Sequence, residues 1–339
     1  MSDRARIVCF GELLVRLSAP DGEQLLQSPV LAAHVGGSEA NVAVSLARFG
    51  HDAAVVSVVP RNALGAAAVS ELRRHRVATD GIIEGQGRMG LYFLTPGAVS
   101  RPGAVLYDRA NSAFARAAPT VIDWPLTLRG ASWLHVSGIT SALGEQAADA
   151  NRRATTAAAS AGISVSFDCN YREQLWAASG ADARRTLHEM VAAARLAFMD
   201  DRDAALILGA EFVGSALDRR RAAAAAAFKE FPRLERICST IRDADSVDRQ
   251  RLWGVLHTRK SELVSRTHTL DGIVDRIGAG DAFAAGMLHG LIARHDEQRA
   301  LDLAAAAAAL KHSVRGDANL VDLADVESLV AGSAGDVRR

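Results

Sequence analysis

The sequence predicts an α/β protein in which a mostly parallel central sheet lies between two layers of helices. Short apolar runs alternate with longer alanine-rich stretches of helical composition. This order is typical of parallel strands joined by helices. With 339 residues, of which 49% are hydrophobic and 23% charged, the chain can form one large domain or two modest ones. Since no linker or repeat marks a boundary, we predict one domain over residues 1–330 and a C-terminal tail over 331–339.

The expected elements follow this alternation along the chain. Strands are expected at 6–15, 52–59, 133–139, 164–168, 196–199, 235–240, 253–257 and 261–264. Helices are expected at 38–49, 63–75, 144–161, 181–194, 203–208, 220–231, 279–291 and 298–312. Alanine is the best helix former, so the alanine runs at 219–227 and 304–309 are interpreted as packed helices and not as low-complexity segments.

Two segments do not fit the alternation and indicate a lid. Residues 24–35 and 88–107 look like hairpin strands, the second with turns at Pro96-Gly97 and Pro102-Gly103. We expect a small second sheet within 12–36 and 88–110 that covers a ligand or another subunit. An apolar strand exposed at its edge would invite pairing with a second copy, so we also predict a homodimer through the lid strands.

Charge and cysteine content exclude several kinds of partner. Lys and Arg together number 39 and Asp and Glu together also number 39, so no global basic field attracts nucleic acid or an anionic membrane. The three cysteines, Cys9, Cys169 and Cys238, are far apart and do not suggest a disulfide framework. The first apolar run is interrupted by Glu12 and is too short for a membrane span or signal peptide. We therefore expect a cytoplasmic protein with no nucleic-acid or membrane partner.

The segment Gly278-Ala279-Gly280-Asp281 is the most informative one for chemistry. Two glycines permit a tight turn, and an apolar helix follows directly. The free N–H groups of a helix N-terminus attract anions, so this turn could hold phosphate oxygens. Asp281, with an ordinary pKa of about 3.9, would be ionised and could accept a proton from a hydroxyl. Alternatively, Asp281 is only a favourable acid in the first turn of a helix. The motifs of P-loop NTPases and of dinucleotide-binding proteins are both absent.

Together with the residues 36–43, Gly-Gly-Ser-Glu-Ala-Asn-Val-Ala, this turn resembles the two signatures of the PfkB, or ribokinase-like, carbohydrate kinases. The resemblance implies a ribokinase-like three-layer α/β/α sandwich with a strand lid over the sugar. It also implies transfer of the γ-phosphate of ATP with Mg²⁺, and it allows a monovalent cation such as K⁺. Asp281 then matches the catalytic base of the family, and the backbone of Gly278, Ala279 and Gly280 matches its anion hole.

Arginine placement favours an acidic sugar. Arg16 follows the first strand where fructokinase-like members tend to carry an aspartate, and Arg109 and Arg172 follow a lid strand and a main-sheet strand. Converging guanidinium groups can bind a carboxylate through paired hydrogen bonds, although each alone could be a surface residue. The surrounding motifs resemble those of 2-keto-3-deoxygluconate kinases, with the 6-phosphate as the product. The substrate contacts then expected are Arg16, Gly37, Asn41, Tyr92, Tyr107, Arg109, Arg172 and Asp317.

The metal and nucleotide positions match the family less well. Asp200 and Asp203 stand where the family usually has Asn-x-x-Glu, which helps to hold magnesium and phosphate. Both are oxygen donors suited to Mg²⁺, directly or through water, or they simply begin the next helix. The nucleotide contacts expected besides Gly278 and Gly280 are Asn170, Thr240 and Arg242.

Two other functions remain open. One is a kinase of fructose or another neutral sugar in the same family, which the arginines disfavour. The other is a non-catalytic sugar- or nucleotide-binding regulator, which the altered Asp200–Asp203 segment allows and the intact 278–281 turn disfavours.

Overall fold

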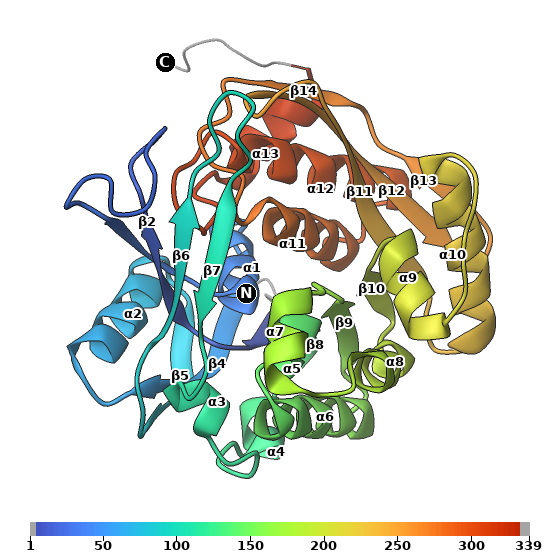
Figure 1. Cartoon of the computed structure of the whole chain (residues 1–339). Coiled ribbons are helices and arrows are strands. Elements are labelled where there is room, and N and C mark those ends of the chain that lie inside the picture. Colours follow the sequence, from blue (N-terminus) through green and yellow to red (C-terminus); the bar gives the residue numbers. More distant parts are fainter. Residues whose placement is uncertain (1–4, 333–339) are drawn as a thin grey trace.

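A ten-stranded sheet runs through residues 5–332, the part of the chain that the computed structural model describes (Figure 1). Its strands are β1 (Arg6–Phe10), β4 (Asp52–Pro60), β5 (Ala78–Gly85), β8 (Ala131–Ser137), β9 (Ser164–Asp168), β10 (Leu196–Phe198), β11 (Arg236–Ala244), β12 (Arg249–Thr258), β13 (Glu262–Val264) and β14 (His268–Asp271). They lie in the order β13-β12-β11-β10-β9-β8-β1-β4-β5, and β14 pairs with β12. The pairs from β5 to β11 are parallel, whereas β12 pairs antiparallel with β11, β13 and β14.

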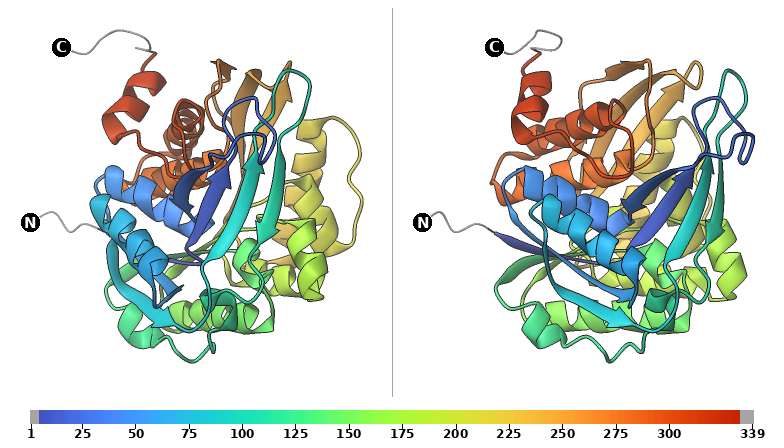
Figure 2. Two further views of the ribbon diagram at one scale, coloured as in Figure 1. Left: turned by 60° about the vertical axis from the view of Figure 1, so that its left-hand side comes forward. Right: turned by 90° about the vertical axis from the view of Figure 1, so that its left-hand side faces the viewer.

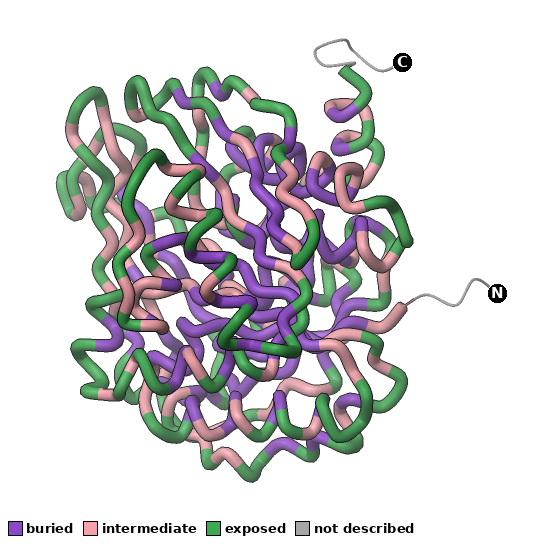
Figure 3. Tube along the Cα trace, turned by 90° about the vertical axis from the view of Figure 1, so that its right-hand side faces the viewer, coloured by how far each residue is buried: buried purple, intermediate pink, exposed green. Residues whose placement is uncertain are grey.

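Helices cover both faces of this sheet. They are α1 (Ser38–Arg48), α2 (Ala63–Arg74), α3 (Ala113–Arg116), α4 (Trp124–Thr127), α5 (Gly138–Ser141), α6 (Glu145–Ser160), α7 (Glu173–Ser179), α8 (Ala183–Ala193), α9 (Asp201–Leu208), α10 (Ala216–Glu230), α11 (Ala279–Ile292), α12 (Glu297–Lys311) and α13 (Leu323–Val330). Side chains alternate between the faces of a strand. Ile7 and Cys9 therefore pack in one core with α1, α11 and α12, and Val8 and Phe10 in another with α6 and α8. Figure 3 shows this buried interior.

A second sheet of four strands, called the lid below, lies beside the first (Figure 2). Its strands are β2 (Leu14–Ser18), β3 (Ala32–Gly36), β6 (Gly90–Thr95) and β7 (Ala104–Asp108), in the order β3-β2-β6-β7. β2 pairs parallel with β6 and antiparallel with β3, and β6 forms a hairpin with β7. All four strands fall within the two ranges expected for a lid.

The single strand expected over 6–15 is wrong, because β1 and β2 belong to different sheets. The chain leaves the main sheet between them, where the backbone N–H of Leu13 bonds Ser57 Oγ at 3.2 Å. All residues from Ile7 to Val15 are buried, on both sides of the crossover. The composition of this run therefore does not show where β1 ends and β2 begins. The 24–35 strand is also shorter than expected and is confined to β3.

Several elements were not anticipated from the sequence. β5 contains Gly81, Asp80 and Glu84, which break the apolar pattern of a buried strand, yet it forms the edge of the main sheet beside β4. β14 and the short helices α3, α4 and α7 were also missed. So was α13, which begins with a reciprocal cap between Asp322 and Asp325. Most of the expected C-terminal tail, residues 333–339, lies outside the described residues. In residues 5–332 the structure contains no helix with the length and hydropathy that a membrane span requires.

Candidate active site

A cavity of about 690 Å³ opens where the carboxyl ends of β9, β10 and β11 meet the lid and the N-termini of α1 and α11. Ligands of open α/β sheets bind at this edge, beyond the ends of the parallel strands. All of the residues expected to contact substrate or nucleotide line the cavity except Arg16: Gly37, Asn41, Tyr92, Tyr107, Arg109, Asn170, Arg172, Asp200, Asp203, Thr240, Arg242, Gly278, Ala279, Gly280, Asp281 and Asp317. The fold thus brings together residues from most of the length of the chain.

Asp281 occupies the first turn of α11 and faces the first turn of α1. Its carboxylate accepts hydrogen bonds from Asn41 Nδ2 at 2.7 Å and Ser38 Oγ at 3.0 Å. Asn170 Nδ2 in turn donates to Ser38 Oγ at 2.9 Å. The Asp281 residue is 9% exposed, and burial raises its pKa to about 6 against the opposing effect of the two donors. A carboxylate with this pKa is ionised at neutral pH and is still basic enough to accept a proton from a hydroxyl.

Gly278 shapes the turn that precedes Asp281. It has a left-handed φ of 82°, and no side chain among residues 5–332 caps the N-terminus of α11. The N–H groups of the first helical turn lack partners within the helix, so they can bind an anion. A Cβ at Gly278 would overlap the backbone carbonyl oxygen of Asp317, whereas a Cβ at Gly280 would meet open space. Close backbone packing therefore sets one side of the turn, and the other side is open to the cavity.

Arg16 does not reach the cavity, which corrects its expected role as a substrate contact. Its side chain is 1% exposed and forms ion pairs with Asp275 at 2.6 Å and Asp317 at 3.2 Å. Asp317 also accepts a 2.6 Å hydrogen bond from the hydroxyl of Tyr92. Two buried carboxylates already pair with the guanidinium of Arg16. Arg16 therefore orients Asp317, which lines the cavity, and does not line the cavity itself.

Arg109 reaches the cavity and is held by a carboxylate that the sequence analysis did not single out. Glu12 Oε2 accepts a 2.6 Å hydrogen bond from Arg109 Nε, and both side chains are buried. Ser112 Oγ donates to the other oxygen of Glu12. The backbone carbonyl of Glu12 also lies where a Cβ of Gly37 would be, which explains the glycine there. Glu12 thus sets the positions of two cavity residues.

Four arginines line the cavity without an ion pair to any residue within 5–332: Arg172, Arg202, Arg242 and Arg276. Two effects lower the pKa of Arg242 to about 10: mainly the loss of hydration among the surrounding protein atoms, and to a smaller extent the charge of Arg276. Like charges that lie close together, as Arg242 and Arg276 do, repel one another, and a bound anion would offset this repulsion. Arg202 and Arg276 were not predicted from the sequence, because surface arginines are common and only the fold shows that these two share a cavity.

Three acids face these arginines. Burial and the charge of Asp281 raise the pKa of Asp168 to about 8, and burial and the charge of Asp200 raise the pKa of Asp203 to about 7. Asp200 and Asp203 cap the start of α9 reciprocally. The alternative that these two acids simply begin the helix therefore accounts for one carboxylate oxygen of each. Asp200 Oδ1 and Asp203 Oδ2 are used in this cap. Within residues 5–332 the other oxygen of each accepts no hydrogen bond, although Asp200 Oδ2 lies 4.0 Å from Arg220 Nη2.

This donor set is compatible with Mg²⁺ but does not form a complete protein cage. Residues 5–332 contain no group of three or more His, Cys, Asp or Glu side chains placed to hold a metal. Mg²⁺ usually binds one or two carboxylates and keeps waters and substrate phosphates as its other ligands. Asp200 and Asp203 can supply that number.

Comparison with known proteins identifies the family. A family model described as pfkB family carbohydrate kinase matches residues 4–239 and 254–323. The chain therefore belongs to the PfkB family of carbohydrate kinases, and the resemblance seen in its two motifs is confirmed.

Its relatives include kinases of sugar acids. The 2-dehydro-3-deoxygalactonokinase of Haloferax volcanii is 33% identical over 335 residues, which cover 99% of each chain. The 2-dehydro-3-deoxygluconokinase of Bacillus subtilis is 26% identical over 91% of this chain and 90% of its own. The crystal structure of the 2-dehydro-3-deoxygluconokinase from Thermotoga maritima is 34% identical and superposes with a TM-score of 0.91, covering 97% of this chain and 100% of that one. The ribokinase-like α/β fold is confirmed.

Proposed function

We propose that this carbohydrate kinase transfers the γ-phosphate of ATP to the terminal hydroxyl of 2-keto-3-deoxygluconate, also named 2-dehydro-3-deoxygluconate, and forms the 6-phosphate. The observation that carries the proposal is the shared cavity: Asp281 and the N-terminus of α11 line it together with Arg109 and Arg172. These groups supply a base, an anion site and cations for a carboxylate. The names of the relatives support a sugar acid as the substrate.

The chain's own residues account for most of the proposed chemistry. Asp281 accepts the proton of the terminal hydroxyl as the oxygen attacks the γ-phosphorus in line, while Asn41 and Ser38 hold the carboxylate in place. The amides of Gly278, Ala279 and Gly280 stabilise charge on the transferring phosphoryl group. Thr240 and Arg242 would contact the phosphates. Asp200 and Asp203 would hold Mg²⁺, which offsets phosphate charge when bound. No residues are assigned to the monovalent cation, which stays a prediction.

A substrate panel tests the proposed function. ADP release is measured with ATP, Mg²⁺ and, in turn, 2-keto-3-deoxygluconate, its galactonate epimer, fructose and ribose. We expect turnover with the sugar acids and little with the neutral sugars. Turnover confined to fructose would support the neutral-sugar kinase instead. Sugar or nucleotide binding without ADP release for any compound would support the non-catalytic regulator.

Substitution of Arg109 tests how the cavity recognises the acid. For Arg109→Ala we expect KM for the sugar acid to rise about tenfold or more, because a charge-assisted hydrogen bond is lost. KM for a neutral analogue should change much less. Steady-state kinetics on both substrates measures this difference, and equal changes would show that Arg109 does not bind the carboxylate.

Two further variants control for stability. Arg109→Ala leaves the buried Glu12 carboxylate without its ion-pair partner, although Ser112 still donates to it. The thermal midpoint of this variant is therefore compared with that of the Arg109→Ala/Glu12→Gln double variant. Arg88→Ala removes an arginine that lies just before β6, and its partner Asp108 is exposed. It should leave KM for the acid near the wild-type value.

We also propose that the protein is a cytoplasmic homodimer that associates through the lid. Leu106 on β7 is 59% exposed, and β7 forms one edge of the lid sheet. Pairing with a second copy would cover this edge. Sedimentation velocity should give the mass of a dimer, and a monomer at micromolar concentration would contradict the proposal.

A further inference from the structure

Arg220 of α10 stands directly behind the wall of the cavity formed by the start of α9 and by β11. Its side chain is 11% exposed and is not among the residues that line the cavity. Three of its neighbours, Asp200, Ser239 and Thr240, do line it. Arg220 is therefore placed to act on the cavity through other residues.

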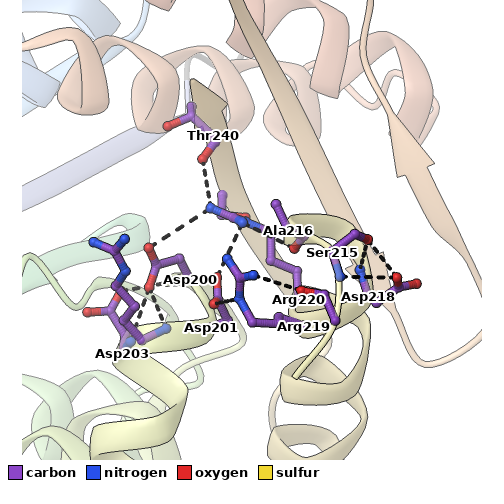
Figure 4. Close-up of polar contacts among 12 residues, drawn as sticks. Asp200, Asp201, Asp203, Ser215, Ala216, Asp218, Arg219, Arg220 and Thr240 are labelled. Carbon is purple, nitrogen blue, oxygen red and sulfur yellow. Dashed lines mark hydrogen bonds and ion pairs between the residues drawn. The ribbon is translucent and has the colours of Figure 1, made fainter. Parts of the chain in front are cut away.

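The guanidinium of Arg220 joins the two elements of this wall (Figure 4). On the β11 side, Nε donates to Ser239 Oγ at 3.1 Å and Nη2 donates to the backbone carbonyl of Thr240 at 3.3 Å. On the α9 side, Nη1 lies 3.2 Å from Asp201 Oδ1 and Nη2 lies 4.0 Å from Asp200 Oδ2. One side chain thus contacts both Thr240 and Asp200 across this wall.

Charge gives Arg220 a second effect on this wall. The start of α9 carries three acids within four residues, Asp200, Asp201 and Asp203. Arg219 Nε pairs with Asp201 at 2.7 Å. Within residues 5–332, Arg220 is the cation in ion-pair range of Asp200. A carboxylate beside bound phosphates repels them, and a partly buried arginine nearby offsets that repulsion more strongly than an exposed one would.

We propose that Arg220 is a positioning residue for nucleotide binding, which holds the Asp200 and Thr240 sides of the cavity together and offsets the charge of Asp200. The proposal rests on the proposed function, because it takes the anion at this wall to be the phosphate chain of ATP. It concerns a residue that touches neither ATP nor sugar.

The first test measures binding of ATP with Mg²⁺ by calorimetry in the absence of sugar. For Arg220→Gln we expect Kd to rise about tenfold, because the charge and both β11 contacts are lost. The KM for the sugar acid should stay within about twofold of the wild-type value, since the sugar lies against other residues. An ATP affinity equal to that of the wild type would overturn the proposal.

Arg219→Gln is the matched control. Arg219 lies on the same helix and also pairs with Asp201, but its other hydrogen bond within residues 5–332 is to the carbonyl of Gly214, and neither Asp201 nor Gly214 lines the cavity. Its loss should lower stability by a similar amount and leave the Kd for ATP within about twofold of wild type. An equal loss of ATP affinity in both variants would show a general effect of α10 and would overturn the proposal.

Rescue tests the charge effect separately. Asparagine caps helices as well as aspartate does, so Asp200→Asn should preserve the start of α9. In the Arg220→Gln background it should restore most of the lost affinity for ATP when binding is measured without Mg²⁺, so that the loss of a proposed Mg²⁺ ligand has no effect. Additive effects of the two changes would contradict the charge argument.

Arg220→Lys is compared in case Arg220→Gln does not fold. It keeps the charge but not both β11 contacts, so we expect a loss of ATP affinity of about threefold. An unchanged affinity in this variant would contradict the bridging role. A wild-type protein that binds ATP but no sugar acid would contradict only the proposed substrate. A wild-type protein that binds no ATP would contradict the proposed function as a whole.

Discussion

Asp281→Asn is expected to lower kcat by roughly 10²–10⁴-fold while the Kd for the sugar acid changes little. The amide nearly matches the carboxylate in shape but cannot accept the proton of the attacking hydroxyl. It can still bond Ser38, since a hydroxyl can donate or accept. Rapid-quench or coupled ADP-release kinetics gives kcat, and calorimetry gives the Kd for the sugar.

The pH profile provides a second readout of the same residue. The pKa of Asp281 is raised to about 6, so its carboxylate is ionised above this pH and becomes protonated below it. In the wild type, kcat/KM should therefore fall as the pH drops through about 6. The acid limb that Asp281 contributes should be lost in the asparagine variant.

Glu297→Gln distinguishes catalysis from helix stabilisation. Glu297 is the acid in the first turn of α12, as Asp281 is in α11, but it pairs with Arg236 and does not line the cavity. If Asp281 only stabilised the N-terminus of its helix, its substitution would cost a few tenths of a kcal/mol, as expected for Glu297. Similar kcat values for the two variants would remove Asp281 from the mechanism.

Gly278→Ala is expected to abolish most turnover and to lower the thermal midpoint. The added Cβ would overlap the backbone carbonyl oxygen of Asp317, and alanine is strained at a φ of 82°. Strain of this kind costs about 1–3 kcal/mol, and relief would require the turn before α11 to move. Misplaced amides would then no longer lie around the transferring phosphoryl group. Kinetics and a thermal melt measure the two effects.

Gly280→Ala is the companion variant with a different expected outcome. A Cβ at this position meets no atom within 4 Å, and its φ is not positive. The thermal midpoint should therefore stay near the wild-type value. Activity should still fall, because the methyl group would project into the space proposed for the phosphates. An active Gly280→Ala variant would place the phosphoryl group elsewhere.

The sequence was most informative where chemistry is local. The turn at 278–281 and the start of α1 at Gly37 and Asn41 could be recognised because each is a short motif at a helix N-terminus. Arg109 and Arg172 were expected to share a cavity, and they do. In each case the residue lies next to an element that the apolar pattern indicates clearly.

The sequence was least informative where a role depends on distant partners. Arg16 looked free to bind substrate, but Asp275 and Asp317 reach it from the far end of the chain. Glu12 looked like an interruption of a strand, and only the crossover to the lid shows that it holds Arg109. Arg220 lay in an alanine-rich helix whose orientation no local pattern specifies.

The way in which the lid is threaded limits how its specificity can be exchanged with that of another kinase. One excursion of the chain, between β1 and α1, provides β2 and β3, and a second, between β5 and α3, provides β6 and β7. The two excursions meet through the β2–β6 pairing and through the contacts of Glu12 with Arg109 and Ser112, and the first runs directly into Gly37 and Asn41. In a chimera that receives only one excursion from another kinase, the contacts between the two excursions would no longer match. Transfer of substrate preference therefore requires both segments together with the start of α1.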